Sequence, residues 1–284
     1  MARPRNFTTV NGHKWAYLRA GKGPPLVLIH GFMSYADYFD YIADQLSDQF
    51  DIIAPDLPGF GFTPKLSENT YRNIAKETKQ FVENLNLGKV DVFGVSLGGA
   101  ICLEYALDYP DKVKSLILNS PFWGKDTLTV GPIEAVEFTL IKLPDSVLNI
   151  LKTKLVFKKL ANFVLGLKPG TKRIFRLNEQ EIIESASLID IDGNRELLYS
   201  LMNMDLSQRL KNFKEGTLLI VGLADKVITP KVAENLRKII GGDLVKVRRE
   251  GHEFVVESPD KLVKIIRSYI LEGKKAQEKD FIWD

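Results

Sequence analysis

The stretch 90–107 is the part of this 284-residue chain that most constrains its fold. An apolar, β-branched run at its start predicts a buried strand, and a helical pattern is established by Ala100. Ser96 stands between the two, flanked by Gly94 and Gly98. A turn this short brings strand and helix so close together that larger side chains beside the serine would collide. We therefore expect a strand, a tight turn and a helix, with the Ser96 hydroxyl exposed at the apex.

The turn reads Gly94-Val95-Ser96-Leu97-Gly98 and resembles G-x-S-x-G, the nucleophile elbow of the α/β-hydrolase family. A short motif with three defined positions is weak evidence on its own. The predicted strand before it and the predicted helix after it are what support the assignment. The alternative is a glycine-rich loop in which Ser96 only caps the helix. Residues elsewhere in the chain are needed to distinguish these two interpretations.

Length and composition indicate one globular domain, elaborated or carrying an insertion. The hydrophobic content of 45% and the charged content of 26% are ordinary, and a net charge of +3 is too small to suggest a nucleic-acid partner. Cys102 is the single cysteine, so an internal disulfide and a cysteine-based metal cage are both excluded. We expect it to be a small buried side chain in the helix after Ser96.

Two further features concern membranes and location. The first residues are basic but lack the apolar stretch of a secretion signal. No apolar run approaches the ~18 residues needed to cross a bilayer. These patterns predict a soluble, cytoplasmic protein without a transmembrane segment.

Eight segments have the apolar or alternating pattern of strands. They are 7–10, 15–18, 25–29, 50–54, 90–95, 113–118, 217–221 and 244–247. Asn11-Gly12, between the first two, is a strong hairpin signal because both central positions of the favoured turn need positive φ. The later strands alternate with helical segments, which predicts parallel strands with right-handed crossovers. The expected fold class is α/β, with a mostly parallel eight-stranded sheet that begins with an antiparallel hairpin.

The alternation of strands and helices is interrupted between residues 122 and 214, where helical periodicity continues with almost no strand pattern. We expect the segments 1–121 and 215–284 to form one α/β-hydrolase core, and 122–214 to form a helical cap. Ligands in open α/β sheets bind at the carboxyl ends of the strands. The cap is therefore expected to cover that edge of the sheet.

The first half of this cap is basic. Between Phe138 and Asn178 a single acidic residue, Asp145, stands among the basic residues Lys142, Lys152, Lys154, Lys158, Lys159, Lys168, Lys172, Arg173 and Arg176. Basic amphipathic helices bind anionic membrane surfaces or acidic substrates. The acidic residues that follow are Glu179, Glu181, Glu184, Asp190, Asp192 and Glu196. The alternative is therefore that the two halves of the cap face each other, or that the lysines form an ordinary solvated surface.

A serine hydroxyl needs a general base, usually a histidine, to act as a nucleophile at neutral pH. His13 and His30 precede Ser96, whereas an α/β-hydrolase has the order serine, acid, histidine, so His252 is the candidate base. Asp225 follows a predicted strand and stands between Ser96 and His252 in the chain. We expect its carboxylate to orient the imidazole, with a turn or helix-cap role as the alternative.

Acyl transfer also needs two N–H donors aimed at the developing oxyanion. The resemblance assigns one to the backbone of Leu97, at the positive end of its helix, and the other to the backbone of Phe32. His30 is expected to hold the loop of Phe32 through hydrogen bonds. The expected substrate pocket is lined by Phe32, Val95, Phe122 and Val227. Neither a metal nor a cofactor is expected.

Several separated motifs together resemble the capped α/β-hydrolases over the whole chain apart from the insertion. They are His30-Gly31-Phe32, Asp56-Leu57-Pro58-Gly59-Phe60-Gly61, the Ser96 elbow, Asp225 and Gly251-His252. Epoxide hydrolases and haloalkane dehalogenases have a similar first loop but attack carbon with an aspartate, and a serine would leave an ether that water does not readily cleave. Carbon–carbon bond hydrolases usually carry a Gly-Pro-rich loop where this chain has Phe32-Met33-Ser34. The resemblance implies a capped serine esterase or lipase.

These observations predict a cofactor-independent serine hydrolase that cleaves carboxylic esters of a small or medium apolar substrate through an acyl-enzyme. The alternatives are a carbon–carbon bond, thioester, lactone or amide hydrolase with the same triad, and a ligand-binding protein without catalysis. We expect a monomer or a homodimer. The tail 273–284 is expected to pack back onto the domain, with a dimer contact as the alternative.

Overall fold

The computed structural model describes residues 4–32, 34–124, 127–129, 142–144, 146–147, 190–213, 216–273 and 275–284. The segment 122–214, predicted to be the cap, is described at its two ends and at a few positions between them. Most of the basic stretch lies outside the described residues. The hypothesis that it contacts an anionic membrane surface therefore concerns residues that the structure does not describe.

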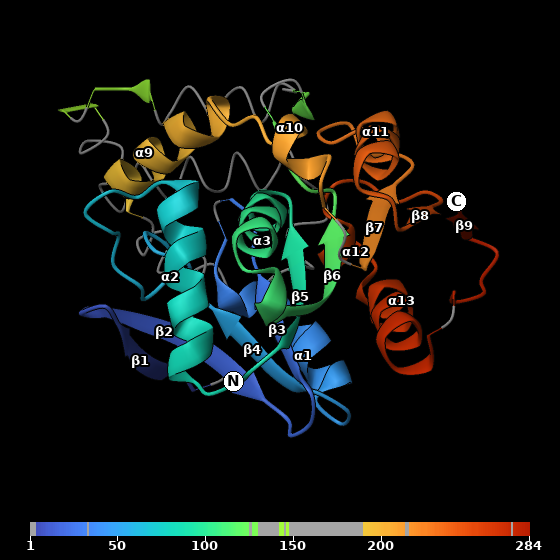
Figure 1. Ribbon diagram of the computed structural model, residues 1–284, viewed down its shortest axis with the longest axis horizontal. Helices are drawn as coiled ribbons and strands as arrows, with labels where there is room; N and C mark the ends of the chain where they lie inside the picture. The colour runs from blue at the N-terminus through green and yellow to red at the C-terminus, as the bar shows by residue number, and fades with distance from the viewer. Residues whose placement is uncertain are drawn as a thin grey trace.

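The centre of the structure is one mostly parallel sheet with the strand order β1-β2-β4-β3-β5-β6-β7-β8-β9 (Figure 1). The strands are β1 (Asn6–Val10), β2 (His13–Ala20), β3 (Pro25–Ile29), β4 (Asp51–Pro55), β5 (Val90–Val95), β6 (Val113–Asn119), β7 (Thr217–Gly222), β8 (Asp243–Val247) and β9 (Phe281–Trp283). The six strands from β4 to β8 in this order are parallel, whereas β1, β2 and β9 pair antiparallel with their neighbours. The predicted α/β class is confirmed.

The sheet has nine strands where the sequence predicted eight, because the C-terminal tail adds one at the edge. β9 pairs antiparallel with β8, and Phe281 lies opposite Val247. The indole N–H of Trp283 donates a hydrogen bond to the carbonyl of Ala276 at 2.9 Å. The tail therefore packs back onto the domain as expected. β9 has only three residues and follows a charged segment, so it is too short to show the period-two pattern that identifies a strand in a sequence.

The predicted hairpin at the start of the chain is present. β1 and β2 are joined by Asn11 and Gly12, whose φ angles of +48° and +84° are those of the favoured two-residue turn. This hairpin extends the sheet beyond β4, with which β2 pairs.

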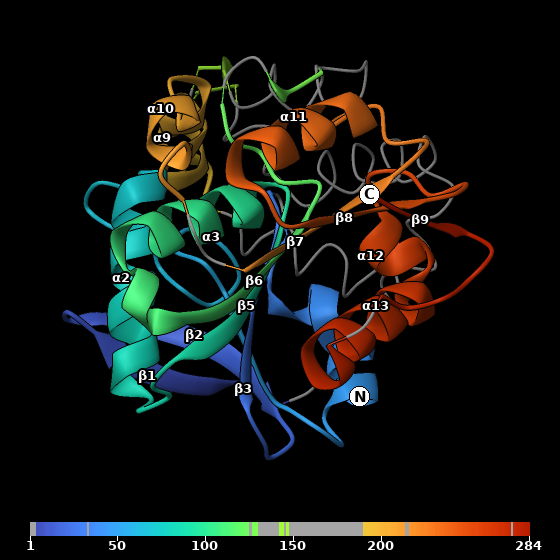
Figure 2. The same cartoon turned by 45° about the vertical axis from the view of Figure 1, so that its right-hand side comes forward.

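Helices cover both faces of the sheet, as Figure 2 shows. One face carries α2 (Tyr71–Asn84), α3 (Leu97–Asp108) and α11 (Pro230–Ile240). The other carries η1 (Ala36–Phe39), α1 (Asp40–Leu46), α12 (Phe254–Glu257) and α13 (Pro259–Glu272). The remaining described helices are η2 (Pro110–Lys112), α9 (Ile191–Met202) and α10 (Ser207–Leu210).

The two hydrophobic cores explain why strands such as β3 and β7 are nearly continuous apolar runs. Side chains alternate along a strand, so Leu219 and Val221 of β7 pack with α2, α3 and α11, whereas Leu218 and Ile220 pack with α12 and α13. Every residue of β7 is buried. A strand that is covered on both sides has no solvated face and therefore no polar alternation.

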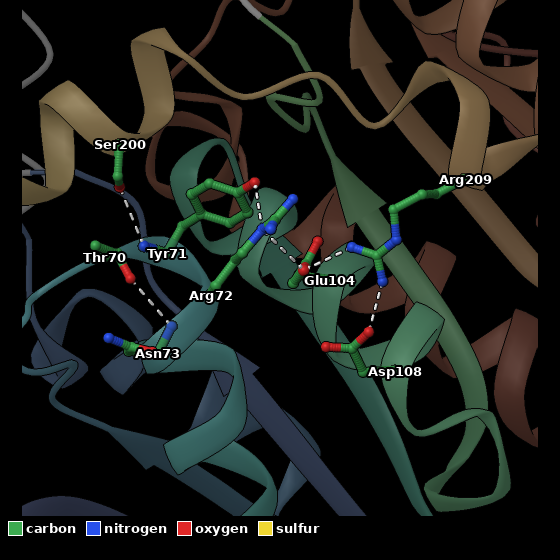
Figure 3. A network of polar contacts seen from close by, with 8 residues as sticks. All are labelled: Thr70, Tyr71, Arg72, Asn73, Glu104, Asp108, Ser200 and Arg209. Carbon is green, nitrogen blue, oxygen red and sulfur yellow. Dashed lines mark hydrogen bonds and ion pairs between the residues drawn. The ribbon is translucent and has the colours of Figure 1, made fainter.

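The end of the predicted cap is tied to the core at the carboxyl side of the strands (Figure 1). Figure 3 shows Arg209 of α10 between two carboxylates of α3, donating to Glu104 at 2.6 Å and to Asp108 at 2.5 Å. The Ser200 hydroxyl of α9 accepts from the backbone N–H of Tyr71 at 3.2 Å. α9 and α10 are thus joined to α2 and α3 by specific polar contacts as well as by apolar packing.

Candidate active site

The elbow between β5 and α3 has the geometry that its glycines predict. Ser96 has φ +51° and ψ −111°, a strained conformation for a residue with a side chain. A Cβ on Gly94 would lie 2.6 Å from the sulfur of Cys102, and one on Gly98 would lie 2.2 Å from the carbonyl oxygen of Ile29. Helix α3 and strands β3 and β5 therefore approach too closely for any larger residue at these two positions.

The imidazole of His252 lies beside the elbow. His252 is in the loop between β8 and α12, and its Nε2 is 3.1 Å from Ser96 Oγ. On its other side, Nδ1 is 2.9 Å from Oδ2 of Asp225. A carboxylate only accepts hydrogen bonds, so Nδ1 carries the proton and Nε2 is left to accept from the Ser96 hydroxyl. Three residues that are far apart in the sequence thus form one line of hydrogen bonds.

Asp225 follows β7 and its side chain is fully buried. Oδ1 accepts from the backbone N–H groups of Val227 and Ile228, each at 2.9 Å. The turn role that was the alternative for Asp225 is therefore real, and the same carboxylate faces His252 as well. Local hydrogen bonds hold the carboxylate in place while its second oxygen remains available to the imidazole.

The two backbone donors proposed for an oxyanion lie on segments that flank Ser96. Leu97 is the first residue of α3, so its N–H has no acceptor within the helix. The loop after β3 passes beside the serine, because a Cβ on Gly31 would lie 3.7 Å from the Cβ of Ser96. Phe32 follows directly in that loop.

His30 holds this loop, as the sequence predicted. Its Nε2 accepts from the backbone N–H of Leu57 at 3.0 Å, so Nδ1 carries the proton and donates to the carbonyl of Gly31 at 2.8 Å. The side chain is buried, and this burial lowers its pKa to about 4. His30 is therefore a neutral link between the loops that follow β3 and β4.

A family model of the α/β hydrolase fold matches residues 24–259 of the chain, which include all of these motifs. The chain belongs to the α/β-hydrolase fold family.

Individual relatives of this α/β-hydrolase include two lipases, and a solved esterase structure shares its fold. Lipase 1 of Psychrobacter immobilis is 30% identical over 286 residues, which cover 95% of this chain and 86% of that lipase. Lipase 3 of Moraxella sp. strain TA144 is 30% identical over 266 residues, covering 89% of this chain and 80% of the lipase. A thermophilic esterase from Thermogutta terrifontis shares the fold, with a TM-score of 0.72 at 21% identity over 95% of this chain and 98% of the esterase. The chain is thus an esterase- or lipase-like member of the family.

The α/β-hydrolase motif around Asp56 also holds loops at this edge of the sheet. Oδ1 of Asp56 accepts from the N–H of Ala36 at 2.8 Å, and Oδ2 accepts from the N–H of Phe62 at 2.9 Å. The guanidinium of Arg5 lies 2.7 Å from Asp37 and 3.6 Å from Asp56. Burial raises the pKa of Asp37 to about 6. No sequence pattern identifies Arg5, because its partners are distant in the chain.

The four predicted pocket residues do not share one face of the sheet. Phe32, Phe122 and Val227 belong to the core that contains α2, α3 and α11, and the N–H of Phe122 donates to the carbonyl of Ser96 at 3.1 Å. Val95 packs on the opposite face of the sheet, in the core that contains α12 and α13. Three of the four residues therefore lie on the face of the sheet that carries α3.

Ser120 is a site residue that the sequence analysis missed. It follows β6, and its hydroxyl donates to Oδ2 of Asp225 at 2.7 Å. The sequence signal for Ser120 is a hydroxyl at the carboxyl end of β6, which pairs with the elbow strand β5. Serines are common in such turns, so this signal is weak.

The described helices also bear on whether the chain crosses a membrane. Within those ranges, none combines the length and the apolar character that a bilayer span requires.

Proposed function

We propose that this α/β-hydrolase cleaves carboxylic esters of small or medium apolar substrates through an acyl-enzyme on Ser96. The observation that carries the proposal is the line of hydrogen bonds from Ser96 Oγ to His252 Nε2 and from Nδ1 to Asp225 Oδ2, at 3.1 and 2.9 Å. A hydroxyl, a neutral imidazole and a buried carboxylate in this order are the parts that nucleophilic acyl transfer requires.

In the first half of the reaction, Ser96 Oγ attacks the ester carbonyl while its proton passes to His252 Nε2. Asp225 keeps the imidazole in the required tautomer and stabilises the imidazolium that forms. The backbone N–H groups of Phe32 and Leu97 donate to the oxyanion of the tetrahedral intermediate. The carbon–alkoxide bond then breaks, and Nε2 returns its proton to the leaving alcohol.

In the second half, water takes the place of the alcohol. His252 Nε2 removes a proton from the water molecule as the water oxygen attacks the acyl carbon. The oxyanion that forms again accepts hydrogen bonds from the backbone N–H groups of Phe32 and Leu97. When the bond to Ser96 breaks, the proton on Nε2 returns to the serine oxygen. The carboxylic acid is released and the starting state is restored without any cofactor.

The kind of substrate is proposed from the relatives and from the residues near the elbow. Both curated relatives at 30% identity are named lipases, which favours an ester with an apolar acyl chain. Phe32, Phe122 and Val227 offer an apolar surface on the α3 side of Ser96. We place the acyl chain there, under a cap formed by 122–214, with 1–121 and 215–284 as the hydrolase core.

The mechanism is tested by labelling the folded protein with a fluorophosphonate, which reacts with activated serines. We expect one adduct on Ser96, and we expect Ser96→Ala to lose both the label and ester turnover. Ser47→Ala is a matched control, because Ser47 is half-buried and its hydroxyl donates to the nearby carbonyl of Asp44. Label on another serine, or undiminished turnover in Ser96→Ala, contradicts the proposal.

A substrate panel separates ester hydrolysis from the alternatives that use the same triad. Activated esters graded by acyl length are compared with a thioester, a lactone, an amide and a substrate with a cleavable carbon–carbon bond. We expect the highest kcat/KM for an ester, with a rise and fall along the acyl series. Binding of these compounds by the wild-type protein with no turnover of any would instead indicate a receptor.

A further inference from the structure

Ser120, which follows β6, is hydrogen-bonded to Asp225, the carboxylate at one end of the line of hydrogen bonds through His252 to Ser96. Its side chain is buried, and its hydroxyl lies 2.7 Å from Oδ2 of Asp225. Since an ionised carboxylate only accepts, the hydroxyl proton points at Asp225. The same Oδ2 accepts from His252 Nδ1 at 2.9 Å. One oxygen therefore receives two donors, the imidazole and Ser120.

The backbone conformation of Ser120 indicates that its side chain, and not only its position, is needed. Its φ is +46°, in the left-handed region that glycine adopts without strain and serine rarely enters. Glycine would relieve this strain but would supply no hydroxyl. The conformation is locked by the sheet, because the N–H of Ser120 donates to the carbonyl of Ile220 in β7 at 2.9 Å.

Ser96 and Ser120 occupy equivalent places on adjacent strands. Ser96 follows β5 with φ +51°, Ser120 follows β6 with φ +46°, and the N–H of Ser96 donates to the carbonyl of Asn119 at 3.0 Å. Each strained turn directs a hydroxyl at one end of the same line. Ser96 faces the imidazole and Ser120 faces the carboxylate.

We infer that Ser120 is a positioning residue for the proposed triad, an inference that rests on the ester-hydrolase function proposed above. The other carboxylate oxygen is held by Val227 and Ile228 of the loop that carries Asp225 itself. Ser120 adds a tie to a different strand and keeps Oδ2 directed at Nδ1. A donor on Oδ2 also stabilises the anion, so the carboxylate attracts the imidazolium less strongly and the proton on Nε2 is released more readily.

Other charged groups around His252 have partners of their own. Glu250, just before the histidine in the chain, accepts from Lys261 at 2.7 Å. Glu253, just after it, is 3.5 Å from the hydroxyl of Tyr38. Asp225 accepts from the imidazole at 2.9 Å. A change at Ser120 therefore reaches His252 through Asp225.

The test compares Ser120→Ala with Ser120→Gly, which both remove the hydroxyl but differ in backbone strain. We expect kcat to fall about 10- to 100-fold in both variants at little-changed KM, the range that loss of a hydrogen bond to a charged group implies. The acidic limb of the kcat/KM profile should move to higher pH by about half a unit in both. Ser47→Ala should keep the wild-type profile. Should Ser120→Ala fail to fold, Ser120→Gly carries the test.

A measurement without turnover keeps this inference separate from the proposed function. In a Ser96→Ala background, NMR titration of the His252 imidazole should give a higher midpoint once Ser120→Gly is added. An unchanged midpoint, or Ser120 variants with wild-type kcat and pH profile while Ser96→Ala is inactive, overturns the inference and leaves the hydrolase proposal intact. Full activity in Ser96→Ala contradicts the hydrolase proposal itself, whereas the titration still measures the Ser120 hydrogen bond.

Discussion

Nε2 of His30 accepts a hydrogen bond from the backbone N–H of Leu57 at 3.0 Å, which couples the loop after β3 to the loop after β4. The bond exists only while the imidazole is neutral, because a protonated ring has no acceptor. The loop that carries Phe32 beside Ser96 therefore depends on the protonation state of a buried residue that takes no part in the proposed chemistry.

This dependence predicts a loss of stability in acid. Burial lowers the pKa of His30 to about 4, against about 6.5 for an unperturbed histidine. The unfolded chain therefore binds the proton more readily, so the stabilisation is complete above about pH 6.5 and is lost as the pH falls toward 4, by about 3 kcal/mol at most. Urea unfolding between pH 7 and pH 4 should give a steeper fall for the wild type than for His30→Gln. His13→Gln is the control, and parallel curves for wild type and His30→Gln would refute the prediction.

Asp37 should show the opposite pH dependence. Its pKa is raised by burial to about 6, so the folded protein binds this proton more tightly than the unfolded chain does. The associated stabilisation is present below about pH 4 and is lost as the pH rises through 6. We expect Asp37→Asn to gain stability relative to the wild type by up to about 3 kcal/mol between pH 4 and pH 7. Asp48→Asn, at a side chain that is 62% exposed, should show no such trend in the same unfolding series.

The elbow glycines should not tolerate even a methyl group. A Cβ on Gly98 would lie 2.2 Å from the carbonyl oxygen of Ile29 and 2.5 Å from that of His30. Since both contacts are backbone atoms, relief requires β3 and α3 to move apart. We expect Gly98→Ala to cost about 3 kcal/mol of stability and most of the proposed esterase activity. Gly216→Ala is the matched control, because a Cβ there meets no heavy atom within 4 Å. Equal melting temperatures for the two variants would count against the close approach.

Arg209 should matter more for stability than Arg72, although both approach the same carboxylate. Glu104 is 2% exposed, and it accepts from Arg209 at 2.6 Å but lies 3.5 Å from Arg72, whose side chain is 62% exposed. Removing the close partner leaves the buried carboxylate with only the more distant and exposed Arg72, so we expect Arg209→Ala to cost about 2–3 kcal/mol. Arg72→Ala should cost under about 1 kcal/mol, as exposed ion pairs do. Denaturant unfolding of both variants measures the difference, and equal losses would be inconsistent with it.

The sequence located the centre of the site because the fold places its parts by topology. Ser96, Asp225 and His252 each follow a parallel strand, and the carboxyl ends of parallel strands meet at one edge of the sheet. Chain order and residue type were then enough to expect the three side chains together. His30 was assigned its structural role for the same reason, since it directly follows β3.

Residues whose importance comes from a distant partner were not predictable in this way. Arg5 is unremarkable until Asp37 and Asp56 are brought beside it, and Ser120 resembles any turn serine until Asp225 is placed 2.7 Å away. Val95 is one of the residues predicted to line the pocket. Side chains alternate along β5, however, and that alternation directs Val95 to the opposite face of the sheet.

The short strand β9 has a consequence for how molecules of this protein behave in concentrated solution. β8 has three buried apolar residues, Leu244, Val245 and Val247. Without β9 it would be the outermost strand of the sheet, with its outer N–H and C=O groups open to a strand of another molecule. The tail occupies those groups through bonds such as the one from the N–H of Asp284 to the carbonyl of Leu244, at 2.8 Å. Lys275 and Asp280 bring charge to the same margin. β9 therefore protects the chain against edge-to-edge aggregation.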